Sequence, residues 1–376
     1  MKRNAGAARR VNFPMKITLL VPDLRGGGVE RVRLLLAHQF LLDGHDVDLV
    51  LLRKRGMLLD QVPVGARVID LQVGRVRRGF IPLVRYLQEQ RPNVLLASMW
   101  PLTTLAVLAA KVARFRGRVV VSEHSTLSRS PQNDGLSGFA LRASMRWVNA
   151  FADDVIGVSA GVLDDLHGLG LRAGVGRVIH NPVAISDART VPDTWHDHPW
   201  VKRPSSQRLL AVGSLKPAKD YPTLLFAMKK VVNSGTDVSL LILGTGPLQG
   251  ELEEQRRVLG LEGHVHFGGF VSDPGPFYRA AGLFVLSSAW EGFGNVIVEA
   301  LAAGTPVVST DCRSGPAEIL ENGRYGRLVP VGGGDALALA IGESLSANHD
   351  ADALRARAND FSVEKTGQAY LQVLVE

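Results

Sequence analysis

Short apolar segments alternate with segments of helical length along most of the chain, and this alternation limits the fold more than any other feature. In the first half the apolar segments are residues 15–21, 46–52, 67–71, 94–98, 119–122, 154–158 and 177–179. In the second half they are residues 208–212, 238–243, 264–267, 283–286 and 306–309. Between the first two segments, residues 29–42 carry apolar side chains at the spacing of one helix face. Strands separated by helices predict an α/β fold whose parallel sheets are covered by helices on both faces.

The alternation is interrupted once, which predicts two domains. The chain has 376 residues, about twice the usual length of a domain. Residues 184–207 are rich in Pro, Asp, Thr and His, lack periodicity and are predicted to form a linker. We expect a disordered basic tail over 1–14, Rossmann-like doubly wound domains over 15–183 and 208–361, and a terminal helix over 362–376 that packs back on the first domain. Ligands of such sheets bind at the carboxyl ends of the strands, so the expected site is a central cleft that both domains face.

Charge is distributed unevenly between the two halves. The first 180 residues hold 26 Lys and Arg and 14 Asp and Glu, a net charge of +12, whereas the remainder has a net charge of −5. A basic half indicates an anionic partner, which could be a phosphate-bearing substrate, a membrane surface or nucleic acid; a skewed but solvated surface is the simpler interpretation. The sequence argues against nucleic acid, because it has no zinc-ligand cluster, RNP-like aromatic pattern or long basic run.

The expected location is the cytoplasm. The single cysteine, Cys312, excludes an internal disulfide framework and fits a reducing compartment. The first residues are basic, but no apolar segment of signal-peptide length follows them. No apolar run approaches the length of a membrane-spanning helix.

Glycine-rich and basic turns follow several predicted strands. Residues 26–28 are three glycines before a predicted helix, where a ligand could approach the backbone and an anion would be favoured. Neither this turn nor residues 244–247 has the G-x-G-x-x-G spacing of a dinucleotide site, and a plain tight turn explains either. Lys216 and Lys219 follow the strand at 208–212, where they could hold a diphosphate or simply face solvent.

Two glutamates frame a glycine-rich turn and an apolar helix. Glu291 precedes the turn, and Glu299 lies among apolar residues, where a carboxylate is costly to bury unless it is paired. In a continuous helix their spacing would separate them by about 12 Å, whereas glycosidase carboxylate pairs lie roughly 5–9.5 Å apart. A hydrolase pair is therefore a poor fit. Separate roles, with each carboxylate accepting hydrogen bonds from a different hydroxyl group of one ligand, are favoured.

These residues resemble a known family. The segment from Glu291 to Glu299 is similar to the E-x7-E motif of the retaining glycosyltransferases of family 4, which have the GT-B fold. The resemblance continues through VGSLKPAKDYPTLL, LILGTGPLQGEL, VHFGGF and STDCRSGPAEIL in family order. It includes the amino-terminal glycine loop and Ser122-Glu123-His124, and it spans residues 15–375.

The resemblance implies a role for each matching residue. Glu299 would bind the ribose of a nucleotide-sugar, Glu291 would contact the donor sugar, and Lys219 would neutralise the diphosphate. His124 would point at the reacting sugar, which gives His124, Glu291 and Lys219 as the catalytic residues. The rest of the donor site would comprise Gly27 and Gly28 beside the phosphates, Ser214, the region Gly269, Phe270 and Val271 facing the base, and Gly292, Phe293, Gly294 and Asn295 at the sugar and diphosphate.

One position departs from the family pattern. Ser214 stands where the family usually has an arginine, which leaves one fewer cation for the leaving diphosphate; Lys216 or Arg313 would have to compensate. The resemblance implies a metal-independent hexosyltransferase with no cofactor. In agreement with this, Asp46-Val47-Asp48 is the start of an alternating strand and not a D-x-D metal site. The expected donor is a UDP-hexose or UDP-N-acetylhexosamine, and the expected acceptor is a glycan or a polyprenyl-linked glycan.

Two other functions stay open. An epimerase or dehydrogenase acting on a sugar nucleotide would need a dinucleotide fingerprint and a Tyr-x-x-x-Lys pair, and none of the five tyrosines has a lysine four residues later. A nucleotide-sugar-binding protein without catalysis would need the same donor residues. Transfer activity distinguishes it from an enzyme.

Basic clusters in the first half predict a membrane-facing surface. Residues 53–55, 75–78 and 114–118 are rich in Arg, and apolar residues adjoin the second and third clusters. If the fold gathers them on one face, that face would rest on anionic lipid at roughly 1 kcal/mol per nearby cation. A lipid-linked acceptor would then be presented at the cytoplasmic side.

Overall fold

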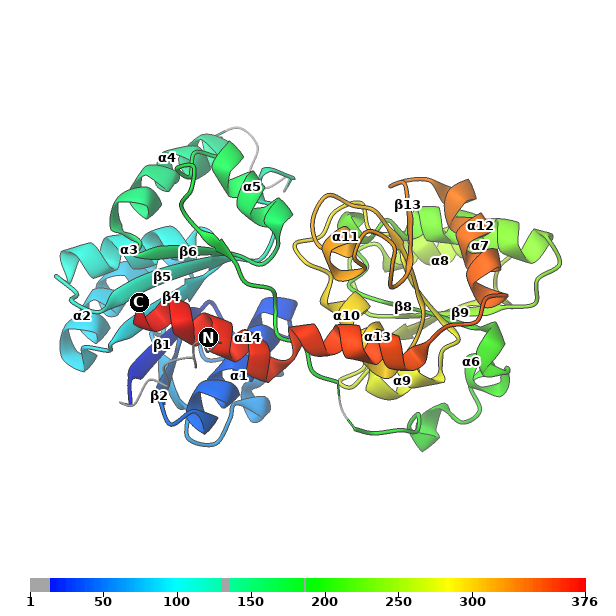
Figure 1. Ribbon diagram of the computed structural model, residues 1–376, viewed down its shortest axis with the longest axis horizontal. Helices are drawn as coiled ribbons and strands as arrows, with labels where there is room; N and C mark the ends of the chain where they lie inside the picture. Colours follow the sequence, from blue (N-terminus) through cyan, green and yellow to red (C-terminus); the bar gives the residue numbers. More distant parts are fainter. Residues whose placement is uncertain (1–13, 130–135, 186) are drawn as a thin grey trace, which may run out of the picture.

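The computed structural model describes residues 14–129, 136–185 and 187–376, and it consists of two α/β domains that lie side by side (Figure 1). The predicted basic tail lies outside these residues except for Pro14. The two doubly wound domains predicted from the alternation are confirmed, and they give the chain the GT-B architecture.

The N-terminal domain has seven parallel strands among the described residues, in the order β3-β2-β1-β4-β5-β6-β7. The strands are β1 (Lys16–Val21), β2 (Asp46–Leu51), β3 (Arg67–Asp70), β4 (Val94–Ser98), β5 (Arg118–Glu123), β6 (Asp154–Gly157) and β7 (Arg177–Val178). The helices are α1 (Gly28–Leu42), α2 (Phe80–Gln90), α3 (Leu102–Val112), α4 (Leu136–Phe151) and α5 (Ala160–Gly168).

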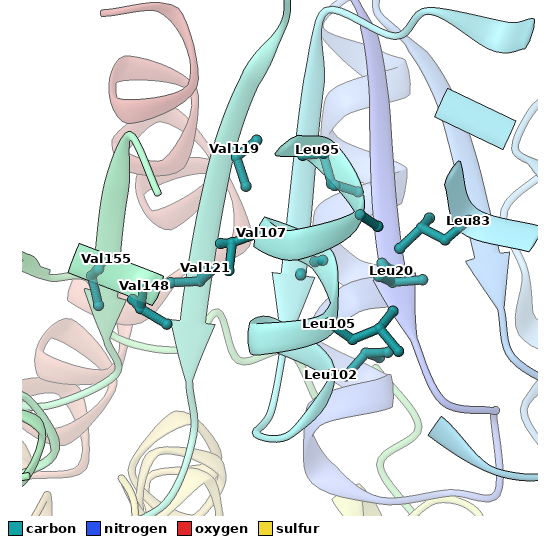
Figure 2. Close-up of a cluster of buried hydrophobic side chains, with 14 of the residues drawn as sticks. Leu20, Leu83, Leu95, Leu102, Leu105, Val107, Val119, Val121, Val148 and Val155 are labelled. Carbon is teal, nitrogen blue, oxygen red and sulfur yellow. The ribbon is translucent and has the colours of Figure 1, made fainter. Parts of the chain in front are cut away.

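Both faces of this sheet are buried, which is why its strands are mostly apolar. Along β1, Leu19 packs in the cluster on one face and Leu20 in the cluster on the other, as the two-residue period of a strand requires. Figure 2 shows the face of Leu20, where α3 covers the strands with Leu105 and Val107.

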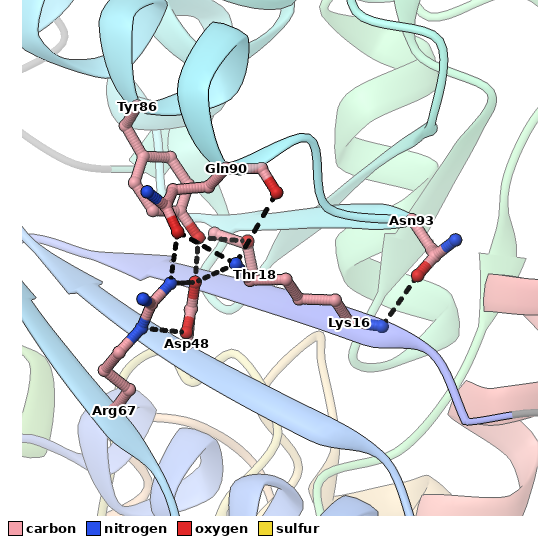
Figure 3. Close-up of polar contacts among 7 residues, drawn as sticks. All are labelled: Lys16, Thr18, Asp48, Arg67, Tyr86, Gln90 and Asn93. Carbon is pink, nitrogen blue, oxygen red and sulfur yellow. Dashed lines mark hydrogen bonds and ion pairs between the residues drawn. The ribbon is translucent and has the colours of Figure 1, made fainter.

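A buried polar network ties β1, β2 and β3 to α2 (Figure 3). The buried Asp48 carboxylate accepts hydrogen bonds from Arg67 Nε at 2.8 Å and from the Tyr86 hydroxyl at 2.6 Å. Thr18 Oγ1 lies 2.7 Å from the same hydroxyl, and Lys16 Nζ lies 3.4 Å from the carboxylate. Burial acts to raise the pKa of Asp48, but the bonds from Arg67 and Tyr86 outweigh it and the pKa is lowered. Asp48 therefore joins strands to a helix.

The C-terminal domain has six parallel strands in the order β10-β9-β8-β11-β12-β13. They are β8 (Arg208–Val212), β9 (Ser239–Leu243), β10 (Val265–Gly269), β11 (Leu283–Leu286), β12 (Val307–Thr310) and β13 (Arg327–Val329). The helices are α7 (Tyr221–Asn233), α8 (Gln249–Val258), α9 (Gly275–Ala280), α10 (Asn295–Ala303), α11 (Pro316–Ile319), α12 (Gly334–Leu345) and α13 (Ala351–Ala358). The alternation did not predict β13, because three residues at a sheet edge carry too little pattern.

The chain passes between the domains twice. In the segment 184–207, helix α6 (Pro199–Lys202) carries the wholly buried Trp200, whose Nε1 donates to the Leu209 carbonyl oxygen at 2.8 Å, so this part packs on the C-terminal domain. The last helix, α14 (Val363–Val375), returns to the N-terminal domain and packs against α1 (Figure 1). Its residues Tyr370, Val373 and Leu374 are buried in the core of that domain.

Candidate active site

A cleft of about 1060 Å³ lies between the domains, where the carboxyl ends of both sheets face each other. The N-terminal domain contributes the loop after β1 and the first turns of α1, including Gly26, Gly28 and Arg31. The C-terminal domain contributes the turns after β8, β9 and β10 and the start of α10. Among the predicted donor residues, those that line this cleft are Gly28, Ser214, Phe270, Val271, Asn295 and Glu299.

The glycine loop presents the start of α1 to the cleft. Gly26 has a φ of +111°, a conformation that L side chains rarely adopt. Gly27 caps the helix with no side-chain hydrogen bond to its first amides, and a Cβ at this position would overlap the Glu30 carboxylate. Amides at such a helix start, together with the helix dipole, favour an anion.

The second glutamate of the motif, Glu299, lies in the cleft on α10. Its Oε2 accepts a hydrogen bond of 2.7 Å from the hydroxyl of Tyr278 on α9. Burial raises the pKa of Glu299, although the Tyr278 bond and the nearby Arg31 and Lys219 act to lower it. Its Oε1 has no hydrogen bond within the described part of the chain, which leaves an acceptor for the hydroxyl group of a ligand.

The first glutamate of the motif, Glu291, forms an ion pair with Lys219. Lys219 Nζ lies 2.5 Å from Glu291 Oε1, and the Ser288 hydroxyl donates to the same oxygen at 2.6 Å. Only 17% of the Lys219 side chain and 12% of the Glu291 side chain are exposed. Lys219 has three donors, so the pair leaves N–H groups for a further anion. The structure thus brings together two residues that the sequence assigned to different parts of the donor.

The turn between the two glutamates is one of the places where the domains touch. A Cβ at Gly292 would overlap the His124 carbonyl oxygen, and Ser159 Oγ of the N-terminal domain donates to the Gly292 carbonyl oxygen at 2.7 Å. Phe293 is buried with its ring stacked on His180 at 5.1 Å. Gly294 has a φ of +99° and precedes α10 without a side-chain cap, so the first amides of this helix receive no side-chain acceptor from it. The Phe293 side chain is therefore structural, and only the backbone of the turn is offered to a ligand.

His124 lies at the carboxyl end of β5 beside this turn. Its Nε2 is 2.9 Å from the guanidinium of Arg33 and 3.2 Å from the Ser122 hydroxyl. Burial and the Arg33 cation lower the pKa of His124 well below its ordinary value, while the Asn181 side chain acts in the opposite direction. Asn181 Nδ2 in turn donates to Asn295 Oδ1 at 3.0 Å, which connects the His124 region to the start of α10.

Glu123 precedes His124, but its side chain serves the fold. It is buried and accepts hydrogen bonds from the Trp100 amide at 3.0 Å and from Thr103 Oγ1 at 2.8 Å. Burial raises its pKa to about 7 against the lowering effect of these two bonds.

The region predicted to face the base closes one end of the cleft. Gly269 ends β10 with a φ of +68°, and its carbonyl oxygen accepts a bond of 2.7 Å from the Gly244 amide. The half-exposed Phe270 and the following Val271 line the cleft. A planar base could lie against such apolar side chains.

The cations of the cleft come from the N-terminal domain. Arg25 and Arg31 line it together with Ser214, whereas Lys216 and Arg313 are not among its lining residues. Arg25 is paired with Asp23, but Arg31 has no ion pair within the described residues, and its Nη2 donates to the Ser272 carbonyl oxygen across the cleft at 3.3 Å. Arg31 thus shares the cleft lining with Ser214, which neither of the two residues that the sequence suggested does.

Sequence reasoning missed Arg31, Arg33, Tyr278 and Asn181. Asn181 carries no local sequence signal, and Tyr278 enters the sequence argument only as one of five tyrosines with no lysine four residues later. A signal for Arg33 existed, since a charged residue stands between Val32 and Leu34 in a helix with mostly buried neighbours. In the described part of the chain, no group of three or more His, Cys, Asp or Glu side chains is arranged to hold a metal ion.

Known proteins share both the sequence features and the fold. A family model described as Glycosyltransferase Family 4 matches residues 26–187, and one described as Glycosyl transferases group 1 matches residues 206–347. The lipopolysaccharide core biosynthesis glycosyltransferase LpsE of Rhizobium meliloti is 34% identical over 54% of this chain, and the chain covers 55% of LpsE, about half its length. The amylovoran biosynthesis glycosyltransferase AmsD of Erwinia amylovora is 26% identical, with 82% of this chain and 85% of AmsD covered.

A solved structure extends the likeness to the whole fold. The crystal structure of Anabaena Alr3699/HepE in complex with UDP-glucose superposes with a TM-score of 0.80 and 26% identity, and it covers 96% of this chain and 99% of that one. The two family matches leave out only residues 1–25, 188–205 and 348–376. The chain therefore carries a Glycosyltransferase Family 4 domain followed by a Glycosyl transferases group 1 domain, joined in a GT-B fold.

Proposed function

We propose that the protein is a retaining hexosyltransferase that moves a hexose or N-acetylhexosamine from a UDP-sugar to a glycan or a lipid-linked glycan in the synthesis of a cell-surface polysaccharide or glycolipid. The observation that carries this proposal is the cleft itself. Glu299 lines it together with the glycine loop and Arg31. The Lys219–Glu291 pair and His124 lie outside this lining, beside the turn at Gly292. The names of LpsE and AmsD, which act in lipopolysaccharide core and amylovoran biosynthesis, support the choice of product.

The charges of the cleft suit the departure of a nucleoside diphosphate. When the bond from sugar C1 to the diphosphate breaks, negative charge grows on the leaving oxygen and positive charge on the sugar ring. Arg31, Lys219 and the first amides of α1 and α10 would stabilise the leaving group, because donors already fixed by the fold need little rearrangement during the reaction. We propose that these groups replace a metal ion and that no cofactor takes part.

Retention of configuration is the stereochemical outcome that we propose. Glu291 is held by Lys219 and Ser288, and Glu299 by Tyr278, so the motif places neither carboxylate as a free nucleophile for C1. The acceptor hydroxyl would attack C1 from the face that the diphosphate leaves, and its proton would pass to the leaving diphosphate oxygen.

The donor can be tested by ligand-dependent stabilisation of the purified protein. UDP is expected to raise the melting temperature more than GDP or ADP at equal concentration, in line with the UDP-glucose bound in the HepE structure. Release of UDP from UDP-sugars in the presence of candidate acceptors then tests transfer. Stabilisation by GDP alone would contradict the choice of UDP. Binding without turnover on any acceptor would support a non-catalytic binding protein, and stabilisation by NAD would favour an epimerase or dehydrogenase.

We also propose that the N-terminal domain rests on an anionic membrane at the cytoplasmic side. Neighbouring helices α2, α3 and α4 expose Ile81, Phe139 and Trp147, with exposed fractions of 61%, 74% and 48%. Basic residues on these helices or next to them include Arg77, Arg78, Arg85, Lys111, Arg142 and Arg146. Among the described helices, none is both long and apolar enough to cross a bilayer. Apolar side chains among cations suit adsorption to the surface of anionic lipid.

Vesicle sedimentation tests this surface. The protein is expected to bind vesicles that contain anionic lipid, and binding should weaken from 0.1 M to 1 M salt because the Debye length falls from ~10 Å to ~3 Å. Reversing Arg77 and Arg78 to Glu should reduce binding, whereas Arg257→Glu on α8 of the other domain should not. Equal recovery with neutral and anionic vesicles would contradict the proposal.

A further inference from the structure

Arg33 is a cation enclosed in the N-terminal domain behind the candidate active site. Its side chain is wholly inaccessible to solvent and extends from α1 to the carboxyl ends of β4 and β5. Arg33 Nε donates to Ser98 Oγ at 2.6 Å, and Nη2 contacts both Ser122 Oγ and His124 Nε2. The guanidinium also lies over the ring of Tyr370 from the C-terminal helix, 5.5 Å from its centre.

The stability of the fold does not by itself explain a buried, unpaired guanidinium at Arg33. Arg33 forms no ion pair with a carboxylate of the described residues, and its Nη1 has no hydrogen-bond partner among them. Burying a charge without a counter-charge is costly, and an apolar residue of similar volume in such a place is often neutral or stabilising. The retained cation therefore points to a role in the neighbouring site.

The chemistry of the contact between Arg33 and His124 fixes the state of the imidazole. A guanidinium has only N–H donors and no acceptor, and it stays protonated in proteins. The 2.9 Å contact of Arg33 Nη2 with His124 Nε2 is therefore a hydrogen bond only if Nε2 carries no proton. The ring must then be neutral, with its single proton on Nδ1.

We propose that Arg33 is a positioning residue that holds His124 as the neutral Nδ1–H tautomer, so that the ring directs its one N–H toward Asn181 and does not act as a proton acceptor in the site. The role of His124 in sugar transfer rests on the proposed function, but the tautomer of His124 does not depend on that function. With Nε2 occupied by Arg33 and the proton on Nδ1, the ring has no free acceptor nitrogen and does not compete with the diphosphate for the acceptor proton.

The Nδ1 side of the His124 ring faces Asn181, which connects the N-terminal domain to α10 of the C-terminal domain. His124 Nδ1 and Asn181 Oδ1 are both buried, neither has a fully formed hydrogen bond in the described residues, and Asn181 acts on the imidazole. The other end of the Asn181 amide donates to Asn295 Oδ1 at the first residue of α10. An Nδ1–H group can donate to Asn181 Oδ1. The tautomer set by Arg33 therefore allows a polar connection from α1 through His124 and Asn181 to Asn295 on α10.

Arg33 is the charge that acts on His124 in this environment. Burial and the Arg33 cation both lower the pKa of the imidazole. The other groups at the ring, Ser122 of β5 and Asn181 after β7, are uncharged, and the neighbouring Glu123 carboxylate is engaged with Trp100 and Thr103. Removing the Arg33 charge should therefore raise the pKa of His124 toward its ordinary value, although burial still opposes protonation.

Nitrogen NMR of protein with ¹⁵N-labelled histidine tests the tautomer directly. The resonances of His124 are identified by their loss in His124→Gln. In the wild type we expect the proton on Nδ1 throughout pH 6–8. In Arg33→Met we expect the proton to move to Nε2, or a titration at higher pH than in the wild type. Arg33→Lys should keep the Nδ1–H form, because an ammonium group is also only a donor. Tyr370→Phe is the matched control, since the Tyr370 hydroxyl has no partner among the described residues.

Turnover separates positioning from a purely structural role. Arg33→Met is expected to lower kcat by about 10-fold to 100-fold, the cost of a misplaced catalytic group, with the Kd for UDP within about 2-fold. Arg33→Lys should recover most of the loss. A wild-type proton on Nε2 would overturn the proposal even if Arg33→Met does not fold, and so would an unchanged tautomer in a folded Arg33→Met. If neither the wild type nor any variant transfers sugar from any nucleotide-sugar, the proposed function fails. The tautomer measurement still decides the inference about Arg33.

Discussion

Replacing Lys219 by alanine is expected to lower kcat of sugar transfer by at least about 10²-fold, the usual cost of removing one fixed electrostatic stabiliser. The ammonium group lies 2.5 Å from Glu291 and is mostly buried, so it acts in surroundings where a charge is weakly screened. Its loss removes a cation that would stabilise the leaving diphosphate. It also leaves Glu291 as a buried carboxylate whose remaining partner is the Ser288 hydroxyl.

The controls for this result use neighbouring residues. Lys216 is exposed in the same turn, whereas Lys219 is mostly buried, so Lys216→Ala should keep kcat within about 3-fold, as is usual for a substitution on the surface. The double variant Lys219→Ala with Glu291→Gln removes the unpaired charge and should recover folding stability without recovering kcat. A Lys219→Ala enzyme with near-normal turnover in initial-rate assays would remove this lysine from the site.

Glu299→Ala is expected to abolish most of the stabilisation that UDP gives. A ligand at 100 times its Kd adds about 2.7 kcal/mol to the free energy of unfolding, and the variant should lose most of this at the same UDP concentration. The physical reason is the free Oε1 of a carboxylate already oriented by Tyr278, which makes it a strong acceptor for the vicinal hydroxyls of a ribose.

Thermal unfolding with and without UDP measures the effect. Tyr278→Phe keeps the carboxylate but removes its orienting hydroxyl, so it should lose only part of the stabilisation. Glu262→Ala replaces an exposed acid of the same domain and should lose none. If Glu299→Ala retains the full UDP-dependent shift, the ribose lies elsewhere in the cleft.

The fold could be predicted from the sequence because its strands are buried on both faces. Residues 94–98 are apolar enough to be recognised without any alternation, and the glycines at 26–28 mark the turn that follows a strand. Strand β13 could not be predicted, because its three residues include an exposed arginine at the edge of the sheet. The local sequence pattern thus predicts a strand wherever the whole segment is buried.

Part of the candidate site could also be predicted from the sequence. Residues at strand ends, such as Ser214 and Phe270, meet at the cleft because the topology brings those ends together. Pairings between distant residues were not predictable: Lys219 and Glu291 are 72 positions apart, and Arg33 and His124 are 91 apart. No local pattern encodes which buried groups meet across such distances, so the roles given to the individual residues stay predictions.

The return of α14 to the N-terminal domain changes the order in which the two domains can be completed during synthesis. Domains generally fold as units, with the amino-terminal one first as the chain leaves the ribosome. Here the core beside α1 lacks Tyr370, Val373 and Leu374 until α14 has been made. The C-terminal strands and helices up to α13 are all available before then. The domain that is translated first is therefore finished after the second, and a nascent chain exposes the unpaired face of α1 until α14 has been made.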